Sequence, residues 1–217
     1  HFTPARWESF KHDLRYFRSL EGPRRWDDAQ TDHGFNGTPV WNILGTVLSN
    51  LAPASRTSVL LLDAIDVGLI FTMVGFMWWA FGWRVVSVGL IVFATNFPSR
   101  WYWIGGSFLR WDWLFWMGLG LCLVKKNKPF WAGAAIMYAT LLRIFPGFLF
   151  VAPLIVLGVH YWKTRKWEPR FLRFFQGGAL AFALLVPLSF ATSGGPSIYP
   201  QFLRNTAKHA ETPLTNY

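Results

Sequence analysis

An apolar stretch of 34 residues, 129–162, lies between two basic clusters, and it constrains the fold more than any other feature of the chain. The clusters are Lys125, Lys126 and Lys128 on one side, and Lys163, Arg165 and Lys166 on the other. A helix needs about 20 residues to cross the hydrocarbon core of a bilayer. Short basic loops prefer the cytoplasmic side. If both clusters are cytoplasmic, the chain between them must cross the membrane outward and return.

The return has one suitable place, Arg143-Ile144-Phe145-Pro146, which leaves arms of 14 residues (129–142) and about 17 residues (144–160). With a rise of 1.5 Å per residue, the first arm reaches only about 21 Å. We therefore expect Arg143 at the end of a short helix, below the outer membrane surface. An arginine at that depth is tolerated only inside protein or beside a water-filled cavity, so Arg143 is a candidate functional residue.

The composition indicates an integral membrane protein. Of the 217 residues 53% are hydrophobic, and a soluble domain of this length does not carry several long apolar runs. The net charge of +10 could suggest nucleic acid, but the basic residues gather at the ends of apolar runs, which excludes that partner. The single cysteine, Cys122, allows neither an internal disulfide nor a cysteine-based metal site. We expect no metal and no cofactor.

The hydropathy pattern predicts an all-α, polytopic membrane bundle of about six transmembrane helices within residues 58–191, with an amphipathic helical segment on the outer face. The predicted crossings are 58–81, 84–97, 107–124, 129–142, 144–160 and 174–191, with Pro187 bending the last turn of the sixth. The inner loops then hold nine Lys or Arg residues and the outer turns three, which supports this orientation.

Two flanking regions are expected outside the membrane. Residues 1–57 predict a helix over 5–22 that ends at Gly22-Pro23, a loop up to Pro39, and an interfacial helix over 39–51 that begins with Pro39. Residues 192–217 begin a further outer segment. Because residues 1–57 must reach the outside and no signal sequence precedes them, we expect the chain to be a fragment with at least one crossing before His1.

The polar residues in the predicted crossings all lie toward the outer leaflet. They are Asp63, Asp66, Asn96, Arg110, Asp112 and Arg143. A buried polar cavity that opens outward would produce this pattern. Simpler interpretations remain open, because Asp63 and Asp66 can favour the start of their own helix and Arg110 can extend to the lipid headgroups.

The segment from Gly105 to Pro146 has a recognisable order of features. A glycine-ended outer turn is followed by an apolar arm, a short basic loop, an arm with the small residues Ala132–Ala135, and then Arg143-Ile144-Phe145-Pro146. This order resembles bacterial membrane glycosyltransferases of the GT-C superfamily, in the mannosyltransferase-like branch that uses polyprenyl-phosphate sugars. Those enzymes typically have Gly-Gln at the turn and Lys-x-x-Pro at the break. Residues 37–53 and 13–17 are similar to the interfacial segment and to the aspartate-plus-aromatics stretch of that family.

The resemblance implies an enzyme of the bacterial cytoplasmic (inner) membrane, multi-pass, that moves a sugar from a polyprenyl-phosphate donor to an acceptor on the outer face. In such enzymes an aspartate of the first outer loop is the general base, so Asp13 is the first candidate, Asp32 the second, and Asp27 and Asp28 the third. The leaving lipid phosphate needs cationic stabilisation. Candidate substrate-binding residues are Arg143, Arg110, Asp112, Arg100 and His33. The expected partners are the lipid-linked donor and membrane lipids.

Two other function classes remain. A non-catalytic structural subunit of a larger membrane complex would have the same tryptophan-rich composition. A transporter would need internal repeats and polar residues near the midplane of the membrane, and the sequence has neither. The enzyme hypothesis differs from these two because it requires Asp13 or Asp32 to lie within about the length of a sugar from Arg143.

The proposed topology can be tested at the basic loop between the third and fourth predicted crossings. A cysteine introduced at Asn127 should react only with a reagent that reaches the cytoplasm, because the surrounding lysines hold this loop inside. The measurement is labelling of intact cells with an impermeant thiol reagent. Labelling of this position from the outside would show that the orientation is wrong.

Overall fold

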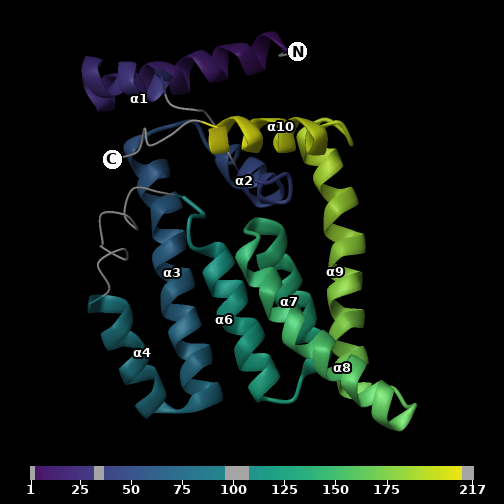
Figure 1. The fold of residues 1–217 in the computed structure, drawn as a ribbon. Coiled ribbons are helices and arrows are strands. Elements are labelled where there is room, and N and C mark those ends of the chain that lie inside the picture. Colours follow the sequence, from purple (N-terminus) through teal and green to yellow (C-terminus); the bar gives the residue numbers. More distant parts are fainter. Residues whose placement is uncertain (1–2, 32–36, 96–107, 212–217) are drawn as a thin grey trace. The chain divides into compact units, whose positions relative to one another are not determined.

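The computed structural model describes residues 3–31, 37–95 and 108–211, and all regular structure in these residues is helical (Figure 1). The predicted all-α class is confirmed for this part of the chain. The chain divides into two compact units, residues 1–62 with 189–217, and residues 63–188.

The helices follow one another closely along the chain. They are α1 (Pro4–Thr31), α2 (Trp41–Ser49), α3 (Arg56–Phe81), α4 (Trp83–Thr95), α6 (Asp112–Lys125), α7 (Pro129–Leu142), the 3₁₀ helix η2 (Phe145–Phe150), α8 (Val151–Thr164), α9 (Pro169–Ser193) and α10 (Ile198–Glu211). The first unit holds α1, α2, α10, the start of α3 and the end of α9. The second unit holds the remaining helices.

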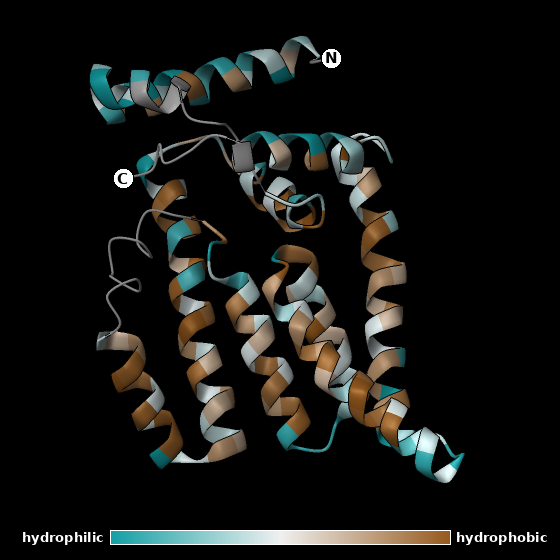
Figure 2. Ribbon diagram, in the orientation of Figure 1, coloured by the Kyte–Doolittle hydropathy of each residue, from teal (hydrophilic) through white to brown (hydrophobic). Residues whose placement is uncertain are grey.

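Three helical segments are long and apolar enough to cross a membrane. They are α3, the continuous segment Phe145–Thr164 formed by η2 and α8, and α9. Figure 2 shows hydrophobic residues along most of their length. The predicted crossings 58–81, 144–160 and 174–191 fall in these segments. Helices α4, α6 and α7 have 13, 14 and 14 residues. That each of these three also crosses a bilayer stays a prediction.

Helix α1 runs further than the sequence predicted. Gly22 interrupts it with φ 73° and ψ 166°, which confirms the break at Gly22-Pro23. The chain then continues as helix from Pro23 to Thr31, so the loop expected over residues 24–31 is wrong. Proline suits the start of this second part, because the first turn of a helix needs no N–H donor from it. The predicted helix over 39–51 is confirmed in its middle, as α2.

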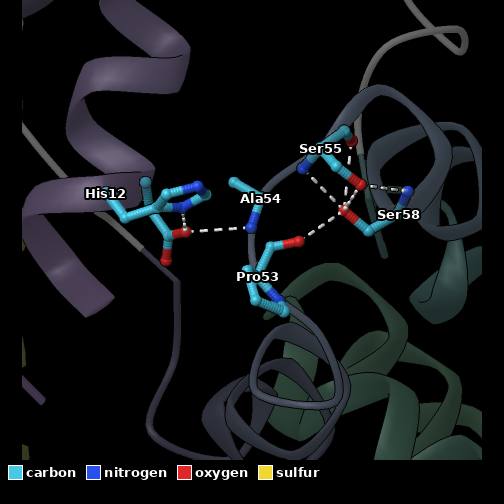
Figure 3. Close-up of polar contacts among 6 residues, drawn as sticks. His12, Pro53, Ala54, Ser55 and Ser58 are labelled. Atoms are coloured by element: carbon cyan, nitrogen blue, oxygen red, sulfur yellow. Dashed lines mark hydrogen bonds and ion pairs between the residues drawn. The ribbon is translucent and has the colours of Figure 1, made fainter. Parts of the chain in front are cut away.

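In the first unit, α1 is bound to the chain that precedes α3 (Figure 3). The Asp13 carboxylate accepts the backbone N–H of Ala54 at 2.9 Å, and the ring of His12 lies 3.2 Å from the same oxygen. Ser55 and Ser58 exchange hydrogen bonds, each hydroxyl accepting the backbone N–H of the other, at 3.2 and 2.8 Å. This reciprocal cap satisfies two donors that a helix start leaves open, and it fixes the beginning of α3 at Arg56.

In the second unit, α7 and α9 approach each other through glycines. A Cβ atom on Gly133 would collide with the carbonyl oxygen of Phe174, and one on Gly177 would collide with the carbonyl oxygen of Phe130. Beside this contact, Ile136 and Phe174 form a buried apolar cluster with Ala132. Helices within a bilayer gain little from the hydrophobic effect against each other, so close backbone packing of this kind holds them together.

This contact predicts a site-specific cost for one added methyl group. Gly133→Ala should lower the free energy of unfolding by about 1–3 kcal/mol, because the backbone of α9 must move to admit the new Cβ atom. Thermal unfolding of the protein in detergent measures the change. Gly158→Ala in α8 is the matched control, since a Cβ atom there meets nothing within 4 Å. Equal melting temperatures for both variants would contradict the packing.

Candidate functional site

A buried carboxylate on α3 fixes the start of α6. Asp66 is 0% exposed, and its two oxygens accept the backbone N–H groups of Arg110 at 2.9 Å and Trp111 at 3.1 Å. These donors immediately precede α6, where a helix leaves N–H groups without partners inside the helix. A negative charge at this end is also favoured by the helix dipole. Asp66 therefore satisfies the N-terminus of a neighbouring helix.

This arrangement corrects one interpretation of the sequence. Asp63 and Asp66 were expected in the first two turns of their helix, where they could favour its start. Helix α3 begins at Arg56 and has no acidic residue in its first turn. Asp66 instead lies in the third turn, where the charge serves α6. The backbone before α6 is shaped for this contact, since Leu109, a buried residue, has the left-handed φ of 50°.

Asp112, the first residue of α6, is a second buried carboxylate. It is 3% exposed, and one of its oxygens accepts the N–H of Trp113 at 2.7 Å. The carboxylate lies within electrostatic range of Asp66, of the Arg143 guanidinium and of the Tyr138 hydroxyl. This buried carboxylate therefore accepts backbone N–H groups from Trp113 and from Asp112 itself, at the start of α6, and has the Arg143 guanidinium within electrostatic range.

Arg143 lies where the sequence placed it, at the end of a short apolar helix. Helix α7 ends at Leu142, and Arg143 follows in an extended conformation with φ −146° and ψ 139°. The 3₁₀ helix η2, which contains the buried Pro146, turns the chain back. The Arg143 side chain is exposed and forms no ion pair within 4 Å with any residue that the structure describes. Arg143 and Asp112 therefore interact through space without touching.

Aromatic side chains surround the start of α6. Trp111 stacks on Trp113 with ring centroids 6.4 Å apart, and Phe93 of α4 meets the edge of Trp111 at 6.2 Å. Trp116 packs on Tyr138 of α7 at 5.0 Å. The indole nitrogen of Trp111 is buried and has no hydrogen-bond partner among the described residues. Carboxylate, indole N–H and aromatic faces together suit a ligand with hydroxyl groups on an apolar ring.

Of the remaining predicted site residues, some lie in the part of the chain that the structure describes and others lie outside it. Arg110 lies beside Asp66, to which its backbone is bonded and its charge is attracted, so binding of a ligand by its side chain stays a prediction. Arg100, His33 and the second candidate base, Asp32, lie outside the described residues. Asp27 and Asp28, the third choice, lie on α1 rather than in a loop.

The first candidate base has a structural contact of its own. Asp13 holds Ala54 through one carboxylate oxygen, in the first unit, whereas Arg143 belongs to the second unit. The expected closeness of Asp13 to Arg143 therefore stays a prediction.

Sequence reasoning missed Tyr138, although it is the only aromatic hydroxyl in the small-residue arm 129–142. That isolated polar group was the available signal. In the described residues, no cluster of three or more His, Cys, Asp or Glu residues could hold a metal ion.

Comparison with protein-family models, with curated proteins and with solved structures finds no match to this chain. What the site does must therefore be argued from its own residues. Three of its helices are long and apolar enough to span a membrane, which indicates a membrane protein, and in the second unit Asp112 lies within electrostatic range of Asp66 and Arg143.

The role of Asp66 predicts a large effect from a small substitution. Asp66→Asn should lower the free energy of unfolding by about 3 kcal/mol, because the amide NH₂ group faces one of the two N–H donors and leaves it unpaired. Thermal unfolding in detergent checks this. Asp63→Asn is the matched control, one turn earlier on the same helix, and should change stability little. If the two variants melt alike, Asp66 does not hold the start of α6.

Proposed function

We propose that this chain is the membrane-embedded part of a glycosyltransferase that moves a sugar from a polyprenyl-phosphate donor to an acceptor. The observation that carries the proposal is the pair formed by exposed Arg143 and buried Asp112, which are electrostatically coupled but not in contact. A guanidinium and a carboxylate within electrostatic range of each other suit a substrate with a phosphate at one end and hydroxyl groups at the other.

Arg143 suits the phosphate end of such a donor. A guanidinium presents a planar fork of N–H donors that matches two phosphate oxygens, and it stays charged at any physiological pH. The phosphate gains negative charge as the bond to the sugar breaks. A cation fixed at that place stabilises the transition state more than the bound substrate, which is the requirement for catalysis.

Asp112 suits the sugar end. Its carboxylate can accept hydrogen bonds from sugar hydroxyls, while Trp111 and Trp113 offer aromatic faces next to it. Inverting transfer also needs a carboxylate that removes the acceptor proton on the face opposite the leaving phosphate. In this proposal Asp13 has that role, as the family resemblance implies, with Asp32 as the second choice.

The proposal includes six crossings of the bacterial cytoplasmic membrane, with α4, α6 and α7 as short crossings beside the three longer ones. The 14 residues of α7 reach about 21 Å. A helix of that length places Arg143 inside the membrane region rather than above it. The low dielectric constant of that region strengthens the attraction of Arg143 for phosphate.

A purely structural subunit accounts less well for the same residues. Asp66 needs no ligand, because its oxygens bind two backbone N–H groups of the protein. Asp112 accepts only backbone N–H groups from the first turn of its own helix. Burying a carboxylate in an apolar bundle costs several kcal/mol unless the charge is compensated, so its presence next to Arg143 favours a functional role.

Replacing Arg143 tests the proposal. Arg143→Ala should reduce sugar transfer by roughly 10²–10³-fold, by analogy with removing one donor from an oxyanion site. Arg143→Lys should recover part of the rate, because the charge remains and the fork is lost. The measurement is transfer from polyprenyl-phosphate sugars by the full-length protein, with the melting temperature recorded for each variant.

Arg84→Ala is the matched control. Arg84 is also an exposed arginine at the end of an apolar helix, α4, but it has no carboxylate partner among the described residues and only stacks on Trp83 at 5.6 Å. Its removal should leave transfer unchanged. A folded Arg143→Ala protein that transfers sugar at the wild-type rate would refute the assignment of the phosphate site.

A further inference from the structure

The helix α10 was not expected from the sequence, and its place in the chain is informative. It begins at Ile198, and only four residues separate it from the end of α9 at Ser193. Gly194 and Gly195 have φ of 81° and 102°, values that residues with a Cβ atom rarely adopt, and the chain changes direction there (Figure 1). Because α9 is one of the three segments that can span a bilayer, α10 starts at the end of a crossing.

Contacts with the last turns of α9 determine which face of α10 points back along that helix. The Tyr199 hydroxyl lies 3.1 Å from the hydroxyl of Ser189, and the Tyr199 ring packs edge-on against Phe190 at 5.8 Å. The N–H of Gly195 donates to the carbonyl oxygen of Phe190 at 2.8 Å, which closes the turn. Tyr199 thus marks the side of α10 that faces the end of the crossing.

The sequence of α10 separates apolar from basic residues about this side. Leu203 and Thr206 are four and seven residues after Tyr199, so they share its face. Gln201, Arg204 and Lys208 lie on the opposite face, and no acidic residue occurs in residues 198–208. Figure 2 shows the mixture of hydrophilic and hydrophobic residues in α10. Leu203 is 64% exposed, although it lies on the face that points toward the crossing.

We propose that α10 lies on the membrane surface, with the Tyr199 face against the lipid and the Arg204 face against anionic headgroups. The partner is a phospholipid bilayer that carries negatively charged lipids. An apolar stripe next to a spanning helix is covered by the hydrocarbon boundary, and cations on the other side attract anionic lipids. Tyrosine is also a residue that prefers this boundary.

A neighbouring helix supports the same placement. The amide of Asn42 on α2 donates to the hydroxyl of Ser193 at 3.0 Å, so α2 is attached to the same end of α9. Leu44, Val47 and Leu51, in α2 and just after it, remain 36%, 54% and 72% exposed among the residues that the structure describes. Two helices at one end of a crossing therefore both present apolar side chains that only lipid would cover.

Two exposed positions on opposite faces of α10 test this placement. Leu203 and Gln201 are both exposed in the protein itself, so spin labels on Leu203→Cys and Gln201→Cys would meet water equally if α10 stood in solution. The buried native cysteine is replaced as Cys122→Ala in both. The full chain is reconstituted in vesicles of phosphatidylcholine with phosphatidylglycerol, and accessibility to oxygen is compared with accessibility to a water-soluble nickel complex.

We expect the label at position 203 to favour oxygen several-fold and the label at 201 to favour the nickel complex. Thr206→Cys and Arg204→Cys repeat the comparison on the same two faces, in case one variant does not fold. Equal access to the nickel complex at all four positions would overturn the proposal. The assignment to anionic lipid is overturned if vesicles of phosphatidylcholine alone give the same depths. Sugar transfer is not measured, so the result is independent of the proposed enzyme.

Discussion

The second unit depends on one hydrogen-bonded carboxylate. Asp66 is fully buried in a mostly apolar helix, and two backbone N–H groups that precede α6 compensate its charge. The same bonds fix where α6 begins, and hence where Asp112 and the tryptophans on either side of it lie. The hydrogen bonds between α3 and the start of α6 are directional, whereas apolar packing between helices is not.

Asp112, on α6, is a second buried carboxylate with different partners. Asp66 accepts backbone N–H groups from the start of another helix, whereas Asp112 accepts those of its own residue and of Trp113, within its own helix, and has the Arg143 guanidinium within electrostatic range. In water, charges more than 4 Å apart would attract each other by less than about 1 kcal/mol. Because Asp112 is buried, the effective dielectric constant around it is lower than that of water and the attraction is stronger.

The sequence was sufficient for features set by local rules. Apolar runs, basic clusters and proline gave the helices α3, α7, α8 and α9 and the position of Arg143 at the end of α7, because length and hydropathy decide these. It was not sufficient for partners distant in the chain. Asp66 and Arg110 are 44 residues apart, and nothing in local spacing indicates that one caps the other's helix. The helix over residues 23–31 was not predicted because the charged residues after Gly22-Pro23 resemble a loop. Helix α10 was not predicted because its many polar residues leave it without a continuous apolar run.

The long helices are apolar and exposed, and this decides what the polar residues among them need. Only 11% of the most apolar stretch of α3 is buried inside the protein, and the same share holds for Phe145–Thr164. Such surfaces are stable where lipid replaces water, so they require no partner from the chain. Charged groups have no such solvent there. Each must find a counterpart in the protein or in a ligand, and Asp66 finds one in the backbone of α6. Asp112 finds backbone N–H groups at the start of its own helix, and it shares a long-range attraction with the exposed Arg143.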